Sequence, residues 1–567
     1  IVREVTELRE ESVKHFLCED GSYIAATYSE PVHYQENGMW KEIDNRLVLN
    51  SETLSESGKP TYTPKSSNFS VSIPQNFSDK QQITAENKGY EISFGLYDGQ
   101  KDVSVKKTAL VTAVDNLSSN TKVREKTAVQ NSRNTMSKFM SVKEEIENYN
   151  ADIMAIDNQS GAVTYQDVFP NTDLEYVLTS NCIKENIVVY EPQSEYKYIF
   201  DMDFGELVPI INRDDSISLV DSTNPEEVVF WIEAPYMYDA IRNESVDIEM
   251  SLAEKGDKYV MTLVADAEWI NDESRVFPVV IDPTIYLADS EFSDVFVING
   301  LYSDSTRVKN ELRVGKNLTN LTRTYIKMDI PTTLTPGCKV TGAYLRLTQD
   351  YYYQALLADD ININVYDCYN VNTWKSHEVS WNNQPYSNSE NGYKSKGVFL
   401  SSKPATKDAS SYTFNITEAV QRWINGGTNN GLMLASSNES TKTQIDFHSS
   451  RVSETSNRPE MWFAYTLPSV SLNSWNAVAS ASTSSAITVT STKDWIATTD
   501  QSWITITDKT STSFSISVSE NSTFFDRNGT VTIKVDNTII GTVSVVQLGT
   551  TPSMTLSETY LFADYDG

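Results

Sequence analysis

Short runs in which apolar and polar residues alternate make up most of this chain, as in AVTYQDVF, LEYVLT and KYVMTLVA. Alternation places successive side chains on opposite faces, which indicates half-buried β-strands. Two stretches break the pattern, and we expect an amphipathic helix in 136–153 and another in 416–424. The pattern predicts an all-β protein: several β-sandwich domains in series, including immunoglobulin-like modules, with one short helical linker.

Shifts in composition divide the chain. After Leu467 the strands become rich in Ser and Thr, which is typical of a small immunoglobulin-like sandwich, and PSVSLNSW at Pro468 recurs as PSMTLSET at Pro552. We expect a first β region in 1–100, a linker with the amphipathic helix in 101–150, a second β region in 151–285, a sandwich in 286–466, an immunoglobulin-like domain in 467–548 and the start of another copy in 549–567.

Charge and cysteine content limit the partners. Acidic residues outnumber basic ones by 77 to 46, for a net charge of −31. Such a surface repels nucleic acid and anionic membranes, so we expect no nucleic-acid partner and a neutral glycan fits better.

The four cysteines are too few for a disulfide framework, and Cys338 and Cys368 either form one bridge or stay reduced. The sequence contains no apolar run of about 18 residues, so we expect no membrane span in it. The start at Ile1 indicates a fragment of a longer protein.

Long strings in the first 285 residues carry a family resemblance: EVTELREESVKHFLCEDGSYIAATYSEPVHY, WKEIDNRL and VFPNTDLEYVLTSNCIKENIVV. They resemble the amino-terminal part of bacterial wall-associated proteins of the YD-repeat (rearrangement hotspot, RHS-like) class. The resemblance implies a secreted, surface-exposed protein of a Gram-positive bacterium. The YD repeats and toxin-like carboxyl end of that class are absent from this sequence.

Two further modules resemble known families. TYIKMDIP, AYLRL, VNTWKSHEVSWNNQP, FNITEAVQRWINGGTNNGLML and RPEMWFAYT are similar to DNRLRE domains, which are β-sandwiches counted among carbohydrate-binding modules. DWIATTDQSWITIT, ISVSENSTFFDRNGTVTIKV and VVQL are similar to BACON domains, many of which serve as spacers. These resemblances imply carbohydrate binding in 286–466 and projection from the wall by the smaller domains.

Exposed aromatic residues are the candidates for a glycan site, because sugars stack their C–H faces on aromatic rings. Alternation would send Tyr351 and Tyr353 to one face of a strand and Tyr352 to the other. Tyr386 and Tyr393 flank the polar loop SNSENG and could form a second edge. The alternative is that these rings pack along the sandwich rim.

Candidate metal ligands are the oxygens of Asp359, Asp360 and Asn362, which would suit calcium as a structural ion, although the Gly and Glu of a calcium loop are missing. A strand's solvent face is the alternative interpretation. A second group of acids is expected at module edges and in loops, where calcium could brace a sandwich, although solvated loop acids are the favoured interpretation: Asp289, Glu291, Asp294, Asp304 and Asp446.

Catalytic motifs do not stand out. The four histidines, His15, His33, His377 and His448, are in neither a zinc-protease nor a nucleophile motif, and we expect them to be structural or surface residues. We therefore expect no enzyme activity and no required cofactor, and a protein that binds carbohydrate or cell-wall polymer in adhesion and display. The alternatives are a non-binding scaffold for a YD-repeat shell or toxin-delivery protein, and a polysaccharide hydrolase or lyase.

Overall fold

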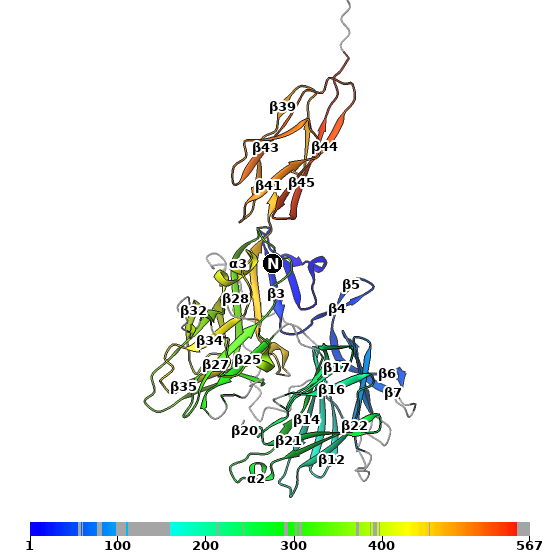
Figure 1. Cartoon of the computed structure of the whole chain (residues 1–567), viewed down its shortest axis with the longest axis vertical. Helices are drawn as coiled ribbons and strands as arrows, with labels where there is room; N and C mark the ends of the chain where they lie inside the picture. The colour runs from blue at the N-terminus through cyan, green and yellow to red at the C-terminus, as the bar shows by residue number, and fades with distance from the viewer. Residues whose placement is uncertain are drawn as a thin grey trace, which may run out of the picture.

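The computed structural model describes residues 1–54, 58, 60–75, 82–97, 109–111, 159–212, 215–241, 243–287, 293–300, 303–304, 309–369, 374–385, 387–388, 394–395, 397–452 and 454–552. These residues form β-sheets in three bodies (Figure 1), so the predicted all-β class is confirmed. The described residues include two α-helices, α2 (Ala267–Ile270) and α3 (Thr417–Ile424). The second is the helix expected in 416–424, whereas the helix expected in 136–153 lies outside the described residues.

The first body, which we call the N-terminal sandwich, spans residues 44–287 and has two sheets. One sheet contains β6 (Asp44–Leu54), β7 (Pro60–Ser66), β8 (Ser70–Pro74), β9 (Ile83–Asn87), β10 (Tyr90–Leu96), β15 (Lys197–Asp203), β21 (Ile248–Lys255) and β22 (Lys258–Ala265). The other contains β11 (Ala109–Val111), β12 (Gly161–Phe169), β13 (Thr172–Leu178), β14 (Cys182–Val189), β16 (Leu207–Ile211), β17 (Ile217–Asp221), β18 (Asn224–Ile232), β19 (Tyr236–Tyr238), β20 (Glu244–Ser245), β23 (Val279–Asp282) and β24 (Thr284–Leu287).

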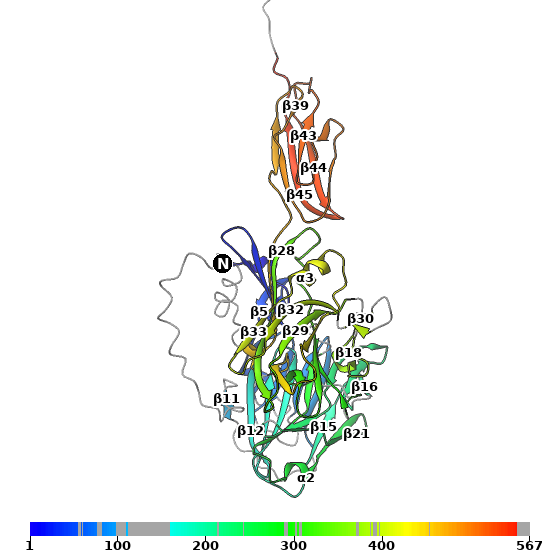
Figure 2. The same cartoon turned by 90° about the vertical axis from the view of Figure 1, so that its left-hand side faces the viewer.

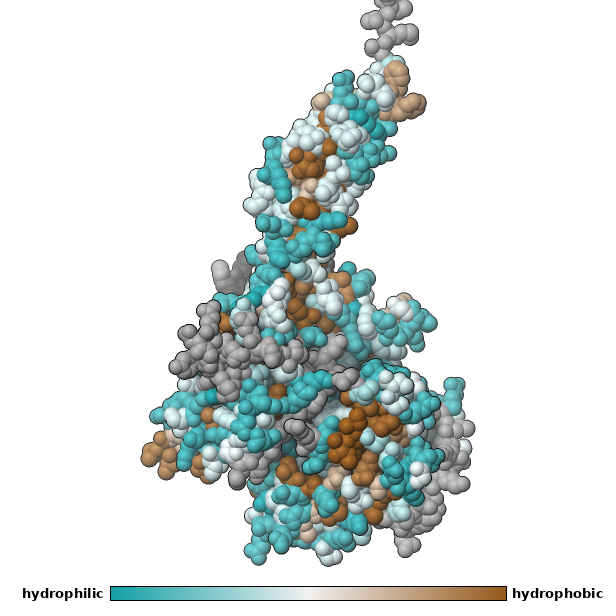
Figure 3. Space-filling model, in the orientation of Figure 1, coloured by the Kyte–Doolittle hydropathy of each residue, from teal (hydrophilic) through white to brown (hydrophobic). Residues whose placement is uncertain are grey.

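One apolar core fills the N-terminal sandwich. It includes Ile73 and Phe94 from before the linker and Tyr176 and Phe230 from after it, and each of these side chains is buried. The two β regions expected on either side of 101–150 therefore share a core. At the edge of one sheet, β16 leaves Val208, Ile210 and Ile211 exposed, and Figure 3 shows apolar surface gathered over β16 and β17.

The second body, the central sandwich, takes its strands from both ends of the chain. From the amino-terminal end come β1 (Arg3–Glu4), β2 (Val13–Leu17) and β3 (Tyr23–Tyr28). The rest are β25 (Ser293–Ile298), β26 (Glu311–Lys316), β27 (Leu321–Lys327), β28 (Lys339–Gln354), β29 (Asn362–Asp367), β32 (Val398–Pro404), β33 (Ser411–Asn415), β34 (Leu432–Ser436), β35 (Thr443–His448) and β36 (Glu460–Thr466).

The long strand β28 joins the two layers of the central sandwich. Its first part pairs with β36 and β33, and its last part pairs with β35 after a register shift between Gln349 and Tyr351. Strand β3 pairs antiparallel with β36, from Tyr23 opposite Tyr465 to Tyr28 opposite Glu460. Residues 3–28 therefore complete a sheet whose other strands lie more than 260 residues further along the chain (Figure 1).

A separate hairpin of β4 (His33–Glu36) and β5 (Met39–Glu42) connects the two sandwiches. In Figure 1 it lies between β3 of the central sandwich and β6 of the N-terminal one.

The two sandwiches pack against each other through polar and aromatic side chains. The Arg313 guanidinium lies 3.2 Å from the Glu244 carboxylate, and Lys309 lies over the Tyr236 ring at 3.5 Å. Trp231 packs against a buried cluster of the central sandwich. The N-terminal sandwich and the central sandwich therefore form one unit, which we call the head.

The third body, the C-terminal module, has its own apolar core. Its strands are β37 (Ser469–Val470), β38 (Ser474–Ala477), β39 (Ser482–Thr483), β40 (Ile487–Thr490), β41 (Trp495–Thr499), β42 (Ile504–Thr507), β43 (Ser513–Val518), β44 (Arg527–Val535) and β45 (Thr538–Gln547). It extends away from the head (Figure 2), and Thr492 anchors it by donating hydrogen bonds to the carbonyls of Gly337 and Cys338, each 3.0 Å long.

All four cysteines are free thiols, which decides the alternative left open for Cys338 and Cys368. No helix in the described parts of the chain has the length and apolar character needed to cross a membrane.

Candidate functional site

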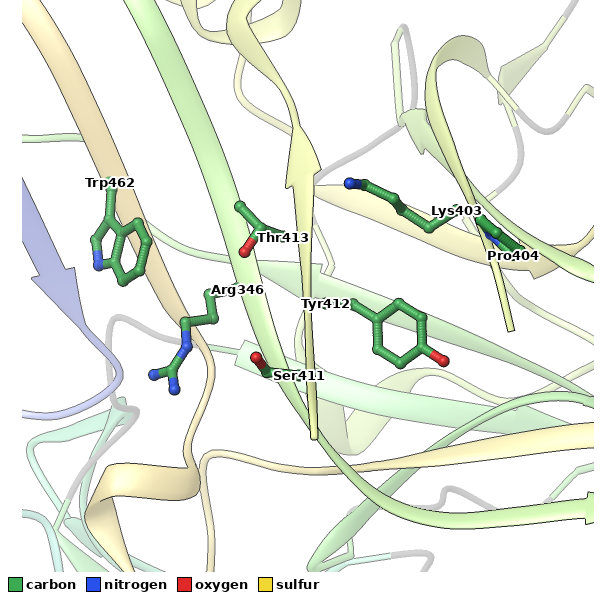
Figure 4. Close-up of a pocket in the computed structure, with 7 residues that line it drawn as sticks. All are labelled: Arg346, Lys403, Pro404, Ser411, Tyr412, Thr413 and Trp462. Carbon is green, nitrogen blue, oxygen red and sulfur yellow. The ribbon is translucent and has the colours of Figure 1, made fainter. Parts of the chain in front are cut away.

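A cavity of about 430 Å³ lies on the central sandwich where β28, β32, β33 and β36 meet (Figure 4). It is lined by Arg346, Lys403, Pro404, Ser411, Tyr412, Thr413 and Trp462.

Strand alternation brings these side chains together. Leu345 and Leu347 are fully buried in the core, so Arg346 between them points to the outer face of the sheet. Met461 and Phe463 are likewise buried and turn Trp462 outward on the neighbouring strand. Arg346 lies opposite Glu460 on one side and Thr413 on the other, so three adjacent strands each contribute to the site.

Arg346, which lines the cavity, also forms an ion pair. Arg346 Nη1 lies 3.2 Å from Glu460 Oε2, and its guanidinium lies 6.0 Å from the centre of the Trp462 ring. Burial raises the pKa of Glu460, and Arg346 acts against that shift. The arginine is thus held in place beside an indole that is only 4% exposed.

The chemistry of the lining suits a sugar. Guanidinium and ammonium groups donate hydrogen bonds to ring hydroxyls or a carboxylate, and Ser411 and Thr413 carry hydroxyls that both donate and accept. The Trp462 indole borders the cavity but is almost fully buried. Arg346 is paired with Glu460, so Lys403 is the cation of the lining that an acidic glycan could meet.

The tyrosines singled out from the sequence lie elsewhere on β28. Tyr351 is 52% exposed, Tyr352 packs against the core and Tyr353 is half-buried. Tyr386 and Tyr393 lie outside the described residues. Their assignment to a glycan site stays a prediction.

The proposed calcium ligands follow the same strand and the turn after it. Asp359 and Asp360 are exposed, and so is Asn362 at the start of β29. Asp360 accepts a hydrogen bond of 3.0 Å from Gln354, and the Asp359 amide donates to Thr441. An ion at this turn stays a prediction.

The second group of acids differs from expectation. Asp294 and Asp446 are buried instead of solvated: Asp294 pairs with Arg451, and Asp446 lies 3.8 Å from Arg313. Asp304 accepts a hydrogen bond from Asn382, while Asp289 and Glu291 lie outside the described residues. Position near a loop was misleading here because two arginines distant in sequence compensate the buried charges.

Three histidines have described side chains. His15 is buried and its Nδ1 lies 2.9 Å from the Tyr465 hydroxyl. His33 is also buried, and His448 lies 3.5 Å from Asp350. The expected structural role suits His15 and His448, whereas His33 lies beside two carboxylates.

Sequence reasoning missed Arg346 and Lys403. The available signal was the string YLRL, in which one arginine interrupts a strand of buried leucines. Trp374, Trp423 and Trp462 are buried, and Trp381 packs against a buried cluster. Trp462 also lines the cavity.

Residues 288–465 match the model of carbohydrate-binding module family 96. The match coincides with the part of the central sandwich that follows residue 287, and it includes every residue that lines the cavity. Residues 493–548 match the BACON family, described as an N-terminal binding domain. The expectation of a carbohydrate-binding module followed by a BACON-like domain is thereby supported.

The chain also resembles long bacterial proteins. It is 24% identical over 487 residues to the tRNA3(Ser)-specific nuclease WapA of Bacillus spizizenii, and over 494 residues to the tRNA(Glu)-specific nuclease WapA of Bacillus subtilis subsp. natto. The tRNA nuclease WapA of Bacillus subtilis is similar to the same degree. Each match covers 82% of this chain and 18% of the relative, so the chain spans less than a fifth of these proteins.

These relatives correct one expectation. They are named nucleases, which are enzymes, so the expectation that the protein is not an enzyme is contradicted. The expectation of no nucleic-acid partner is weakened for the same reason. The absence of a catalytic motif concerns only the residues of this chain, which spans less than a fifth of the relatives. That absence therefore did not decide whether the protein is an enzyme.

Solved structures show limited likeness. A GH5 xyloglucanase of Bacteroides ovatus in complex with an XXXG heptasaccharide has 23% identity and a TM-score of 0.13, covering 14% of this chain and 18% of that one. The N-terminal domain of a Streptococcus gordonii adhesin has 8% identity and a TM-score of 0.10, covering 96% and 95%.

Proposed function

We propose that this chain is the glycan-binding, surface-exposed part of a longer secreted protein, and that the cavity at Arg346 and Trp462 holds the glycan. The observation that carries the proposal is that the cavity lies within the segment matching carbohydrate-binding module family 96. The role would be attachment to cell-wall polymer or another polysaccharide on a Gram-positive cell, with the C-terminal module projecting the head.

The test is a glycan array probed with the full chain, using neutral and carboxylated oligosaccharides. Lys403→Gln removes a cation at the cavity, and Lys407→Gln removes an exposed cation a few residues away. We expect about tenfold weaker binding for the first, because a hydrogen bond to a charged group contributes about 1.5–3 kcal/mol. The second should bind as the unchanged protein does.

Two further arms address the predicted residues. Tyr351→Ala reports on the aromatic surface of β28, and addition of a chelator reports on calcium at Asp359, Asp360 and Asn362. Loss of binding in Tyr351→Ala but not in Lys403→Gln would move the site from the cavity to the tyrosine surface. If Tyr351→Ala and Lys403→Gln both bind the glycan as tightly as the unchanged protein does, both locations are contradicted.

A second candidate function is a scaffold that carries a nuclease. It is favoured by the relatives, which are named tRNA nucleases and match this chain over 82% of its length. Under this proposal the parent protein belongs to the YD-repeat class and delivers a nuclease encoded outside this chain. Absence of glycan binding under every condition, together with nuclease activity of the parent, would favour it over adhesion.

A further inference from the structure

The hairpin of β4 and β5 carries a cluster of possible metal ligands. His33 at the start of β4 lies opposite Glu42 at the end of β5, and Glu4 approaches from β1. One ligand-type atom from each side chain lies within 4.8 Å of the others. Among the described residues, this is the one group of three such side chains that converge.

His33 supplies an independent sign of a ligand. Its ring is fully buried, and Nδ1 lies 2.7 Å from the Glu10 carbonyl oxygen. A carbonyl only accepts, so Nδ1 carries the proton and Nε2 of the neutral ring presents a lone pair. Nε2 has no hydrogen-bond partner, and a buried polar atom without a partner costs about 1–3 kcal/mol. This is also the arrangement of metal-binding histidines, whose second nitrogen donates to a carbonyl or carboxylate.

Arg9 and Lys14 already contact the two carboxylates, and each contact uses one particular carboxylate oxygen. Arg9 binds Oε1 of Glu4 at 2.6 Å and Oε1 of Glu42 at 3.0 Å, and Lys14 binds Oε1 of Glu42 at 3.0 Å. All three contacts use Oε1, so Oε2 of each carboxylate remains for coordination. The cations orient the carboxylates and also weaken a metal ion electrostatically.

We propose that His33, Glu4 and Glu42 bind one zinc ion through Nε2 and the two carboxylates. One imidazole nitrogen with two carboxylate oxygens suits Zn²⁺, whereas Ca²⁺ and Mg²⁺ take oxygen ligands. The side chain of Glu42 is 55% exposed, which gives the ion access from solvent. Water would complete the coordination.

The ion would brace the head. A two-stranded hairpin is marginally stable alone, and this one connects the central and N-terminal sandwiches (Figure 1). Zinc bound to β1, β4 and β5 would fasten the hairpin to the strands that complete the central sandwich.

The test is calorimetric titration of the metal-stripped full chain with zinc chloride, together with thermal unfolding. We expect one zinc ion per chain and a higher Tm with zinc. His33→Gln and Glu42→Gln should weaken binding at least tenfold and abolish the Tm shift. Glu36→Gln is the matched control, because it removes an equal charge at the other end of β4 and should leave binding unchanged.

Lys14→Gln separates a metal site from a plain ion-pair network, and it keeps the proposal testable if His33→Gln fails to fold. Removing the competing ammonium should tighten zinc binding severalfold. Unchanged or weaker binding in Lys14→Gln would overturn the proposal. Absence of saturable zinc binding by the unchanged protein would also overturn it. So would an equal loss of zinc affinity in Glu36→Gln and Glu42→Gln when both variants are folded.

Discussion

Arg458 and Glu30 form an ion pair in which each side chain is only 3% exposed. Glu30 also accepts a hydrogen bond of 3.2 Å from the Ser180 amide. The pair joins three parts of the chain: the segment after β3, the residues before β36 and the N-terminal sandwich. It holds the two sandwiches of the head together.

Replacing one member of this pair should therefore be costly. Arg458→Met leaves the Glu30 carboxylate buried without its partner, which typically lowers the free energy of unfolding by about 3–5 kcal/mol. Denaturant-induced unfolding measures the loss. Arg3→Met is the control, because its partner Glu7 is exposed and such pairs contribute about 0–1 kcal/mol. Equal losses in the two variants would show that burial of the Glu30 pair is not what matters.

Stability should depend on pH through the carboxyls around Arg313. Burial raises the pKa of Glu311 to about 8 and that of Asp446 to about 7, and Arg313 acts against both shifts. In the unfolded chain these groups return to about 4.5 and 3.8. The folded state then binds more protons than the unfolded state between these values, so the free energy of unfolding falls as pH rises from about 5 to about 8.

Unfolding in urea at a series of pH values measures this slope. Glu311→Gln imitates the protonated acid and should make the slope shallower. A stability that rises across pH 5–8, or an identical slope in Glu311→Gln, would contradict the assignment.

The amino-terminal strands should be essential to the fold of the central sandwich. Deletion of residues 1–28 removes β1, β2 and β3, which exposes the edge of β36 and uncovers Tyr344 and Trp462 in the cluster shared with Phe16 and Tyr28. Exposed edges and apolar surface favour aggregation. We expect loss of the cooperative calorimetric transition of the head and loss of glycan binding.

A chain that ends at Leu467 is the control for this deletion. The C-terminal module has its own core and meets the head near Gly337, so its removal should leave the Tm of the head nearly unchanged. A folded, glycan-binding protein that lacks residues 1–28 would contradict the role of β3.

Thiol reactivity should distinguish the four cysteines. Burial raises the pKa of Cys182 to about 11 and of Cys368 to about 12, and it also raises the pKa of Cys338. Alkylation requires the thiolate, so in the native protein only the half-buried Cys18 should react rapidly with iodoacetamide. Mass spectrometry should find four modified cysteines after unfolding without reductant. Two unmodified cysteines under those conditions would indicate a disulfide.

The sequence by itself determined the strands, because alternation needs only neighbouring residues: Leu345, Arg346 and Leu347 already specify which side of β28 enters a core. It also determined the helix α3, and it carried the resemblances to carbohydrate-binding and BACON modules. These properties are local or are written in contiguous strings.

Only the tertiary structure decided which strands pair and which charges meet. The pairing of β3 with β36 joins residues more than 430 positions apart, and no periodicity specifies such a partner. Arg346, Lys403 and Trp462 line one cavity because β28 pairs with both β36 and β33, and β32 lies against β33. His33 and Glu4 converge for the same reason. Charged side chains gain their roles from neighbours that the fold supplies, since a buried ion is stable only where its partner is also placed.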